Sequence, residues 1–170
     1  MKVAGWTFRG NIPNVAKAVI IVAPHTSNWD FVIGAAAMLA LDLDLRFLGK
    51  HTLFDGPLAP IMRALGGIPV DRSQPGSGVV DKMIELFSAQ QQLILALAPE
   101  GTRGKVTRWR TGFHSIASGA AVPIVPVALD YGRRTIFLGP PTDAGEDLEA
   151  DLAGLRAFFK NAAGRRPLAG

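Results

Sequence analysis

The first residues that could do chemistry are a histidine and an aspartate five positions apart, in the segment His25-Thr-Ser-Asn-Trp-Asp30. The run before them, 18–23, is apolar and β-branched, a pattern typical of a strand buried on both faces. Ligands gather at the carboxyl ends of such strands, so the position of His25 favours a functional role. The two side chains can meet only if the segment is a turn entering a helix, because five helical residues turn about 500°. Asp30 could then accept the Nδ1 proton of His25 and leave Nε2 as a general base.

The same segment also fits a helix-capping box, Ser27-Asn-Trp-Asp30. In that interpretation Asp30 only accepts hydrogen bonds from backbone amides where the helix begins. The motif taken alone leaves both interpretations open.

A second polar segment, Pro99-Glu-Gly-Thr-Arg103, also follows a buried strand. Gly101 permits close backbone approach, Thr102 offers a hydroxyl, and Arg103 carries a two-pronged donor that matches phosphate oxygens. These residue types indicate an anion site, and an ordinary polar turn is an equally good alternative. Glu100 could pair with Arg103 in either case.

Two further segments combine strand-forming and polar residues. In Gly66-Gly-Ile-Pro-Val-Asp-Arg72, a glycine pair and a short strand bring Asp71 and Arg72 to a strand end. Arg72 could join the anion site, although a surface ion pair is the simpler interpretation. Val122-Pro-Ile-Val-Pro-Val127 is an apolar strand whose alternatives are core packing and a wall for an acyl chain.

The elements that must position these residues alternate between strand and helix along the chain. We therefore expect one α/β domain, residues 1–170, with a mostly parallel or mixed central sheet and helices on both faces. The expected strands are 3–10, 18–23, 45–48, 68–70, 93–98, 122–129 and 135–138, and the expected helices are 28–41, 57–65, 78–90, 111–119 and 148–160.

The composition of the chain excludes several kinds of site and partner. With 48% hydrophobic residues the chain can form a substantial core, and without cysteine it has no thiol nucleophile or disulfide. A net charge of +4 is too small to predict a nucleic-acid partner. The purest apolar run, Phe31 to Leu41, has 11 residues, against the roughly 20 that span a bilayer, so we expect no membrane-spanning segment. His51 and His114 lack metal-ligand spacing, and we expect no metal requirement.

In this order the four segments resemble the motifs of the glycerophospholipid acyltransferase family, whose best-known members are the lysophosphatidic acid acyltransferases. The chain looks most like the short bacterial members, and the resemblance implies a glycerol-3-phosphate acyltransferase-like fold. It implies that His25 is the base and Asp30 its orienting carboxylate. It also implies an acceptor-phosphate site at Arg72, Glu100, Gly101, Thr102 and Arg103, with Lys50 as a weaker candidate for the anionic end of a substrate.

The implied reaction moves a fatty acyl group from an acyl-CoA or acyl-ACP thioester to a hydroxyl of a lysophospholipid or glycerol-phosphate-type acceptor. No cofactor is implied beyond the co-substrate, and acyl carrier protein is a candidate partner. We expect a cytoplasmic protein that visits anionic membranes at their cytoplasmic face, held by a basic segment with Lys105, Arg108, Trp109 and Arg110. The alternative is a non-catalytic, basic lipid-surface binding domain that uses the same segment together with Arg103. A phosphoester hydrolase is disfavoured because no acidic cluster lies near His25 in the sequence.

Overall fold

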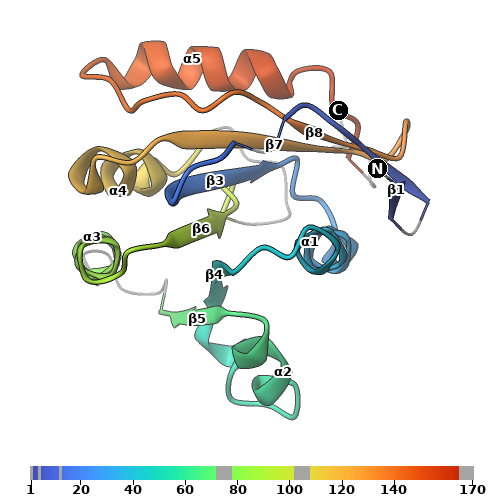
Figure 1. The fold of residues 1–170 in the computed structure, drawn as a ribbon, viewed down its shortest axis with the longest axis horizontal. Helices are drawn as coiled ribbons and strands as arrows, with labels where there is room; N and C mark the ends of the chain where they lie inside the picture. Colours follow the sequence, from blue (N-terminus) through green and yellow to red (C-terminus); the bar gives the residue numbers. More distant parts are fainter. Residues whose placement is uncertain (1, 4, 12, 72–77, 102–107, 165–170) are drawn as a thin grey trace.

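The computed structural model of the chain describes residues 2–3, 5–11, 13–71, 78–101 and 108–164. A mixed sheet of eight strands runs through it, in the order β1-β2-β8-β7-β3-β6-β4-β5 (Figure 1). The strands are β1 (Lys2–Val3), β2 (Trp6–Arg9), β3 (Lys17–Ala23), β4 (Leu45–Lys50), β5 (Gly67–Val70), β6 (Leu93–Leu97), β7 (Ile124–Asp130) and β8 (Thr135–Leu138).

The centre of the sheet is parallel and its far edge is mixed. Strand β3 pairs in parallel with β6 and β7, and β4 pairs in parallel with β6 and β5. Strand β8 returns antiparallel to β7, β2 runs parallel to β8, and β1 is antiparallel to β2. Because the central strands are parallel, all their carboxyl ends meet at one edge of the sheet.

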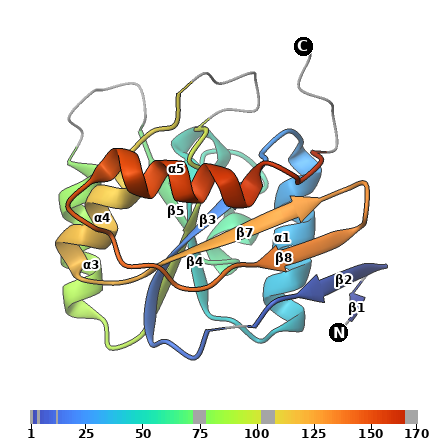
Figure 2. The ribbon, with the colours of Figure 1, turned by 90° about the horizontal axis from the view of Figure 1, so that it is seen from above.

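Helices cover both faces of this sheet. Helices α3 (Val79–Ala89), α4 (Gly112–Ala120) and α5 (Leu148–Phe159) pack on one face, where they build the larger core with β3, β6 and β7. Helix α1 (Asn28–Ala40) lies on the other face against a smaller cluster from β2, β7 and β8. Figure 2 shows α5 running beside β7, with α3 and α4 to one side and α1 to the other. The predicted α/β fold with helices on both faces is confirmed.

The remaining elements lie at the β4–β5 end of the sheet. A short 3-10 helix, His51–Leu53, follows β4, and α2 (Ala59–Ala64) precedes β5 and is shorter than the helix expected over 57–65. In Figure 1 this part forms a protruding lobe below the sheet. No described helix is long and apolar enough to cross a membrane.

Two sequence expectations need correction or refinement. The single edge strand expected over 3–10 is instead two strands, β1 and β2, paired antiparallel across Gly5, whose φ of +80° suits a turn. The proline-containing segment 122–127 belongs mainly to the core, since Ile124 and Val125 are each 1% exposed.

Candidate active site

The candidate site lies where the carboxyl ends of three neighbouring strands meet. Registers that pair Ile21 with Leu97 and Ala23 with Ala128 align the ends of β3, β6 and β7. The residues that follow these ends therefore come together from distant parts of the chain. They are His25 after β3, Glu100 after β6 and Tyr131 after β7.

Asp30 lies in the first turn of α1 and is almost completely buried, at 3% exposure. Its Oδ2 accepts hydrogen bonds from the backbone N–H groups of Thr26 and Ser27, each at 2.7 Å. Ser27 in turn caps α1, because its hydroxyl accepts from the N–H of Trp29 at 3.3 Å. The capping box predicted as one of two alternatives is thus present.

The same oxygen of Asp30 also faces the histidine. His25 Nδ1 lies 3.4 Å from Asp30 Oδ2, and the histidine side chain is 23% exposed while the carboxylate is 1% exposed. This distance is longer than that of a well-formed N–H···O hydrogen bond, and such contacts in free enzymes often tighten when substrate binds. The arrangement of an accessible imidazole backed by a buried carboxylate suits a general base with a fixed tautomer. The capping box is thus shown, and the geometry is compatible with the second interpretation, in which His25 and Asp30 form a catalytic pair.

Glu100 has a role that the sequence motif did not suggest. Its Oε2 accepts a hydrogen bond from the backbone N–H of His25 at 2.7 Å, so the end of β6 anchors the loop that carries the histidine. Burial raises the pKa of the Glu100 carboxyl, the bond from His25 lowers it, and the neighbouring charge of Asp30 raises it further. Glu100 therefore positions backbone next to the pair.

The turn after β6 also brings in a cation. Gly101 has a φ of +67°, and a Cβ at this position would lie 2.7 Å from Arg110 Nε. Arg110 N–H donates to the carbonyl of Pro99 at 2.8 Å. The positive φ favours a residue without a Cβ at this position, and the Arg110 side chain packs close against it. Arg110 thus lies beside the candidate anion segment.

The structure describes only some of the other residues of the predicted phosphate site. Arg72, Thr102 and Arg103 lie outside the described residues. Lys50 ends β4 and is exposed. Since β4 is two strands from β3 in the sheet, Lys50 is roughly 10 Å along this edge from the end of β3.

Sequence reasoning missed Tyr131, which donates a hydrogen bond from its hydroxyl to Asp30 Oδ1 at 2.7 Å. The two residues are 101 positions apart, so no local spacing reveals the contact. The available signal is that Tyr131 directly follows a buried strand, like His25 and Glu100, and is the single tyrosine of the chain.

The two other histidines lie outside this cluster. His114 Nε2 is 2.8 Å from Asp151 Oδ2, which joins α4 to the first turns of α5. The hydrogen bond from His114 lowers the pKa of Asp151. His51 Nδ1 is 3.9 Å from Asp71 Oδ1, between the ends of β4 and β5. Among the described residues, no group of three or more acidic or histidine side chains could hold a metal ion.

The structure shows that Trp109, expected to hold the protein on a membrane, packs partly against the core. Its half-buried ring makes edge-to-face contacts with Phe113 at 6.4 Å and Phe159 at 5.6 Å. The Arg156 guanidinium lies over the same ring, 5.8 Å from its centroid. The indole therefore packs against the core through α4 and α5, and its role at a membrane stays a prediction.

We expect Glu100→Gln to flatten the pH dependence of stability. The folded state raises the Glu100 pKa above the ordinary value of 4.5, so the native protein loses stability as pH rises from about that value through the raised pKa. Glutamine keeps an oxygen that accepts from His25 N–H but has no charge to bury. Urea unfolding of wild type and variant across this pH range measures the difference.

Glu85→Gln, at an exposed position of α3, is the matched control and should follow wild type. A Glu100→Gln profile that runs parallel to the wild-type profile would contradict the assigned cause of the pKa shift.

The chain is similar in sequence to known acyltransferases. Residues 6–130 match the model of the Acyltransferase family. The chain is 29% identical over 149 residues to a 1-acyl-sn-glycerol-3-phosphate acyltransferase of Streptococcus pneumoniae, covering 82% of this chain and 52% of that protein. It is 29% identical over 125 residues to a chloroplast 1-acyl-sn-glycerol-3-phosphate acyltransferase of Brassica napus, covering 70% of this chain and 35% of that one.

The chain thus spans about half or less of the length of these relatives. The family match includes His25, Asp30 and Glu100, with strands β3 and β6 and helix α1. On this match, which covers well over half of the sequence, the chain belongs to the Acyltransferase family.

Proposed function

We propose that this chain is an O-acyltransferase that moves a fatty acyl group from a thioester to a hydroxyl of a glycerol-phosphate-type lipid. The observation that carries the proposal is the accessible His25 imidazole, 3.4 Å from a buried carboxylate at the carboxyl edge of the sheet. Membership of the Acyltransferase family and the names of both relatives support the same reaction class.

In the proposed mechanism His25 acts as general base and Asp30 holds and stabilises it. Nε2 takes the proton of the acceptor hydroxyl while the hydroxyl oxygen attacks the thioester carbonyl. The carboxylate stabilises the imidazolium that forms. The carbon–sulfur bond then breaks, and the departing thiolate receives the proton from the imidazolium. The chain has no cysteine, and we propose direct transfer without an acyl-enzyme intermediate.

For the acceptor we propose a phosphate site formed by the Glu100–Arg103 segment with Arg72. The guanidinium of Arg110, close to Gly101, adds a cation at the same turn. Guanidinium groups bind phosphate through paired hydrogen bonds, which suits a glycerol-phosphate headgroup. Lys50 is a second candidate for an anionic part of the substrate, further along the sheet edge. The donor in this proposal is acyl-CoA or acyl-ACP, with no separate cofactor.

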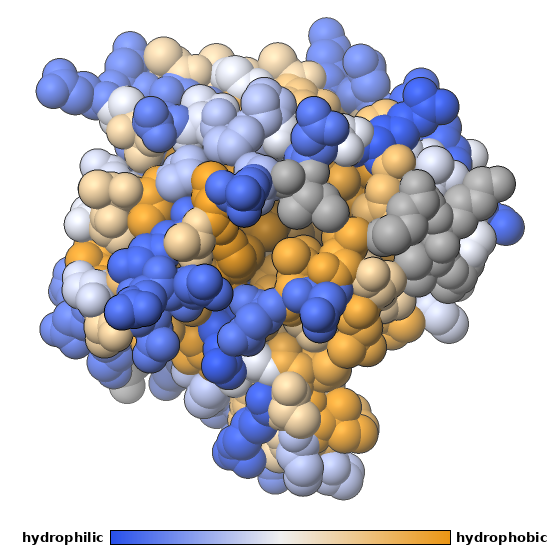
Figure 3. Space-filling model, viewed as in Figure 1, coloured by the Kyte–Doolittle hydropathy of each residue, from blue (hydrophilic) through white to orange (hydrophobic). Residues whose placement is uncertain are grey.

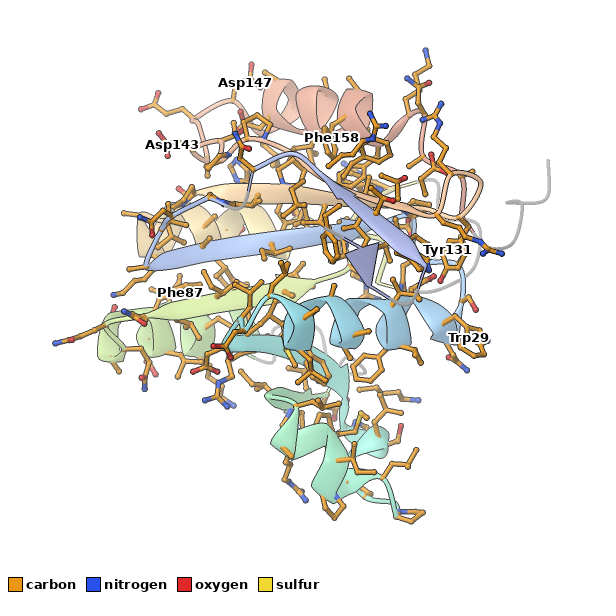
Figure 4. The ribbon with its side chains drawn as sticks, turned by 45° about the vertical axis from the view of Figure 1, so that its right-hand side comes forward. Trp29, Phe87, Tyr131, Asp143, Asp147 and Phe158 are labelled. Atoms are coloured by element: carbon orange, nitrogen blue, oxygen red, sulfur yellow. The ribbon has the colours of Figure 1, made fainter. Side chains whose placement is uncertain are left out.

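We further propose that the protein visits an anionic membrane at its cytoplasmic face through an apolar surface formed by α1 and the α2 lobe. Six large apolar side chains on these elements are between 43% and 68% exposed. They are Trp29, Val32 and Leu39 on α1, and Leu53, Leu58 and Ile61 on the lobe. Figure 3 shows apolar surface extending over the protruding lobe, and Figure 4 shows Trp29 projecting from the first turn of α1. These six side chains are more exposed than the partly packed indole of Trp109.

His25→Ala should abolish acyl transfer and leave the protein folded, because a partly exposed loop side chain contributes little to packing. General-base catalysis is worth about 10² to 10⁴ in rate. The assay is free-thiol release from acyl-CoA and acyl-ACP donors with glycerol 3-phosphate and a panel of lysolipids. Circular dichroism and thermal unfolding test whether the variant is folded. A folded His25→Ala protein with near-normal turnover would contradict the assignment of His25 as the general base.

The double variant Leu58→Ser/Ile61→Ser should weaken binding to vesicles of phosphatidylglycerol and phosphatidylcholine. Burying one such side chain contributes about 1.5–3 kcal/mol, so partial burial of two predicts a loss of about tenfold or more in partitioning. Co-sedimentation with vesicles measures it. Lys82→Ser/Glu85→Ser, at exposed positions of α3, is the control. Equal binding by both double variants would refute the proposed surface.

A further inference from the structure

Tyr131 is held by three contacts, of which one is with Asp30. Its hydroxyl donates to Asp30 Oδ1 at 2.7 Å, and its ring stands edge-on to Trp6 with centroids 4.8 Å apart. Its backbone N–H donates to the carbonyl of Ala163 at 2.8 Å. In Figure 4, Tyr131 lies at the same end of the molecule as the first turn of α1, which carries Trp29. The contacts of the ring with Trp6 and of the backbone with Ala163 therefore fix the position of the hydroxyl beside the carboxylate.

The contacts of Asp30 divide between its two oxygens. Oδ2 accepts from the N–H groups of Thr26 and Ser27 and faces His25, whereas Oδ1 accepts from Tyr131. The carboxylate is 1% exposed, so water is a poor substitute for a lost donor. The Asp30 carboxylate rotates easily about its Cβ–Cγ bond, and hydrogen-bond donors at both oxygens restrain this rotation. The plane of the carboxylate, and with it the direction in which Oδ2 faces His25, depends on both sets of donors.

A second carboxylate close by makes this restraint more important. Glu100 lies near enough for its charge to interact with that of Asp30. Tyr131 donates to Asp30, and Glu100 accepts from the N–H of His25, so the two carboxylates have different donors. A neutral hydroxyl that donates to Asp30 stabilises its negative charge beside Glu100 without adding a competing cation.

We propose that Tyr131 is a positioning residue of the His25–Asp30 pair, whose hydroxyl holds the Asp30 carboxylate in the orientation that keeps the proton of His25 on Nδ1. The inference rests on the proposed function, because it concerns the same base. It adds a residue that acts on the imidazole only through Asp30, from the end of a strand that the His/Asp motif does not include.

The test is Tyr131→Phe, which keeps the ring and its contact with Trp6 and removes only the hydroxyl. We expect kcat to fall about tenfold, the size expected for one lost hydrogen bond to a charged group, while KM for the thioester stays within about twofold. We also expect ¹⁵N resonances of His25 to report a smaller share of the Nδ1–H tautomer. A purely structural role would change neither the tautomer ratio nor kcat at a temperature where the variant is folded.

Thr135→Val is the matched control. Thr135 begins β8, is 5% exposed, and donates its hydroxyl to the carbonyl of Arg133 at 3.0 Å. Its replacement removes another buried hydroxyl hydrogen bond at this edge of the sheet without touching Asp30. We expect comparable loss of thermal stability with wild-type kcat and tautomer ratio. If Tyr131→Phe behaves like Thr135→Val in both readouts, the inference is overturned.

A second measurement, ¹⁹F NMR, tests the contact between Tyr131 and Asp30 without the Tyr131→Phe variant. Because Tyr131 is the single tyrosine, growth on 3-fluorotyrosine labels this hydroxyl's ring alone. The ¹⁹F resonance should move in Asp30→Asn far more than in Thr135→Val, and equal small shifts would contradict the contact.

The two proposals fail in distinguishable ways. If the wild-type protein shows no acyl transfer, the proposed function is wrong, and if His25→Ala retains acyl transfer, the assignment of the base is wrong. In both cases the tautomer and ¹⁹F measurements still decide the role of Tyr131. If His25→Ala is inactive and Tyr131→Phe matches wild type in kcat and tautomer ratio, only the inference about Tyr131 fails.

Discussion

A buried carboxylate must have its oxygens satisfied by donors, and at Asp30 this requirement organises the site. The backbone amides of Thr26 and Ser27 supply donors because the chain turns sharply there to begin α1. The same turn brings His25 back toward Oδ2, to 3.4 Å. The helix cap and the orientation of the imidazole are therefore consequences of one set of contacts. A change that frees the carboxylate disturbs both.

The parallel sheet supplies what this local motif lacks. The ends of β6 and β7 flank the end of β3, so Glu100 and Tyr131 reach the His25–Asp30 segment from either side. Glu100 holds backbone next to His25, and Tyr131 holds the far oxygen of Asp30. Glu100 and Tyr131 each follow a different strand of the same sheet. Because the strands are rigid, they fix the positions of these side chains relative to His25 and Asp30 more precisely than a long loop would. The exposed apolar side chains of α1 begin with Trp29 in the same turn, so the proposed membrane surface starts next to the His25–Asp30 segment.

Local sequence signals predicted most elements well, because burial and chain breaks are local properties. The β-branched run before Pro24 and the cap at Ser27 placed β3 and α1 to within one residue at each end. The contacts across the sheet were not predictable in this way. Tyr131 meets Asp30 across 101 positions, and the choice of the core over the surface for Trp109 depends on Phe159 in α5. Both require knowledge of which strands and helices are neighbours. The role of the His25–Asp30 pair was left open because a capping box and a catalytic pair share one local pattern.

The central claim is that the charge of Asp30, beyond its capping role, prepares His25 for catalysis. Comparing Asp30→Asn with Ser27→Ala tests it most directly, by single-turnover thiol release together with urea unfolding. Loss of an N-cap hydroxyl costs about 1 kcal/mol of stability, so Ser27→Ala should be destabilised and keep a near-normal rate. Asp30→Asn retains an acceptor for the backbone amides and should lose about 10²-fold or more in rate, because no carboxylate stabilises the imidazolium. Equal rates in the two folded variants would show that Asp30 serves only to cap the helix and would contradict the account.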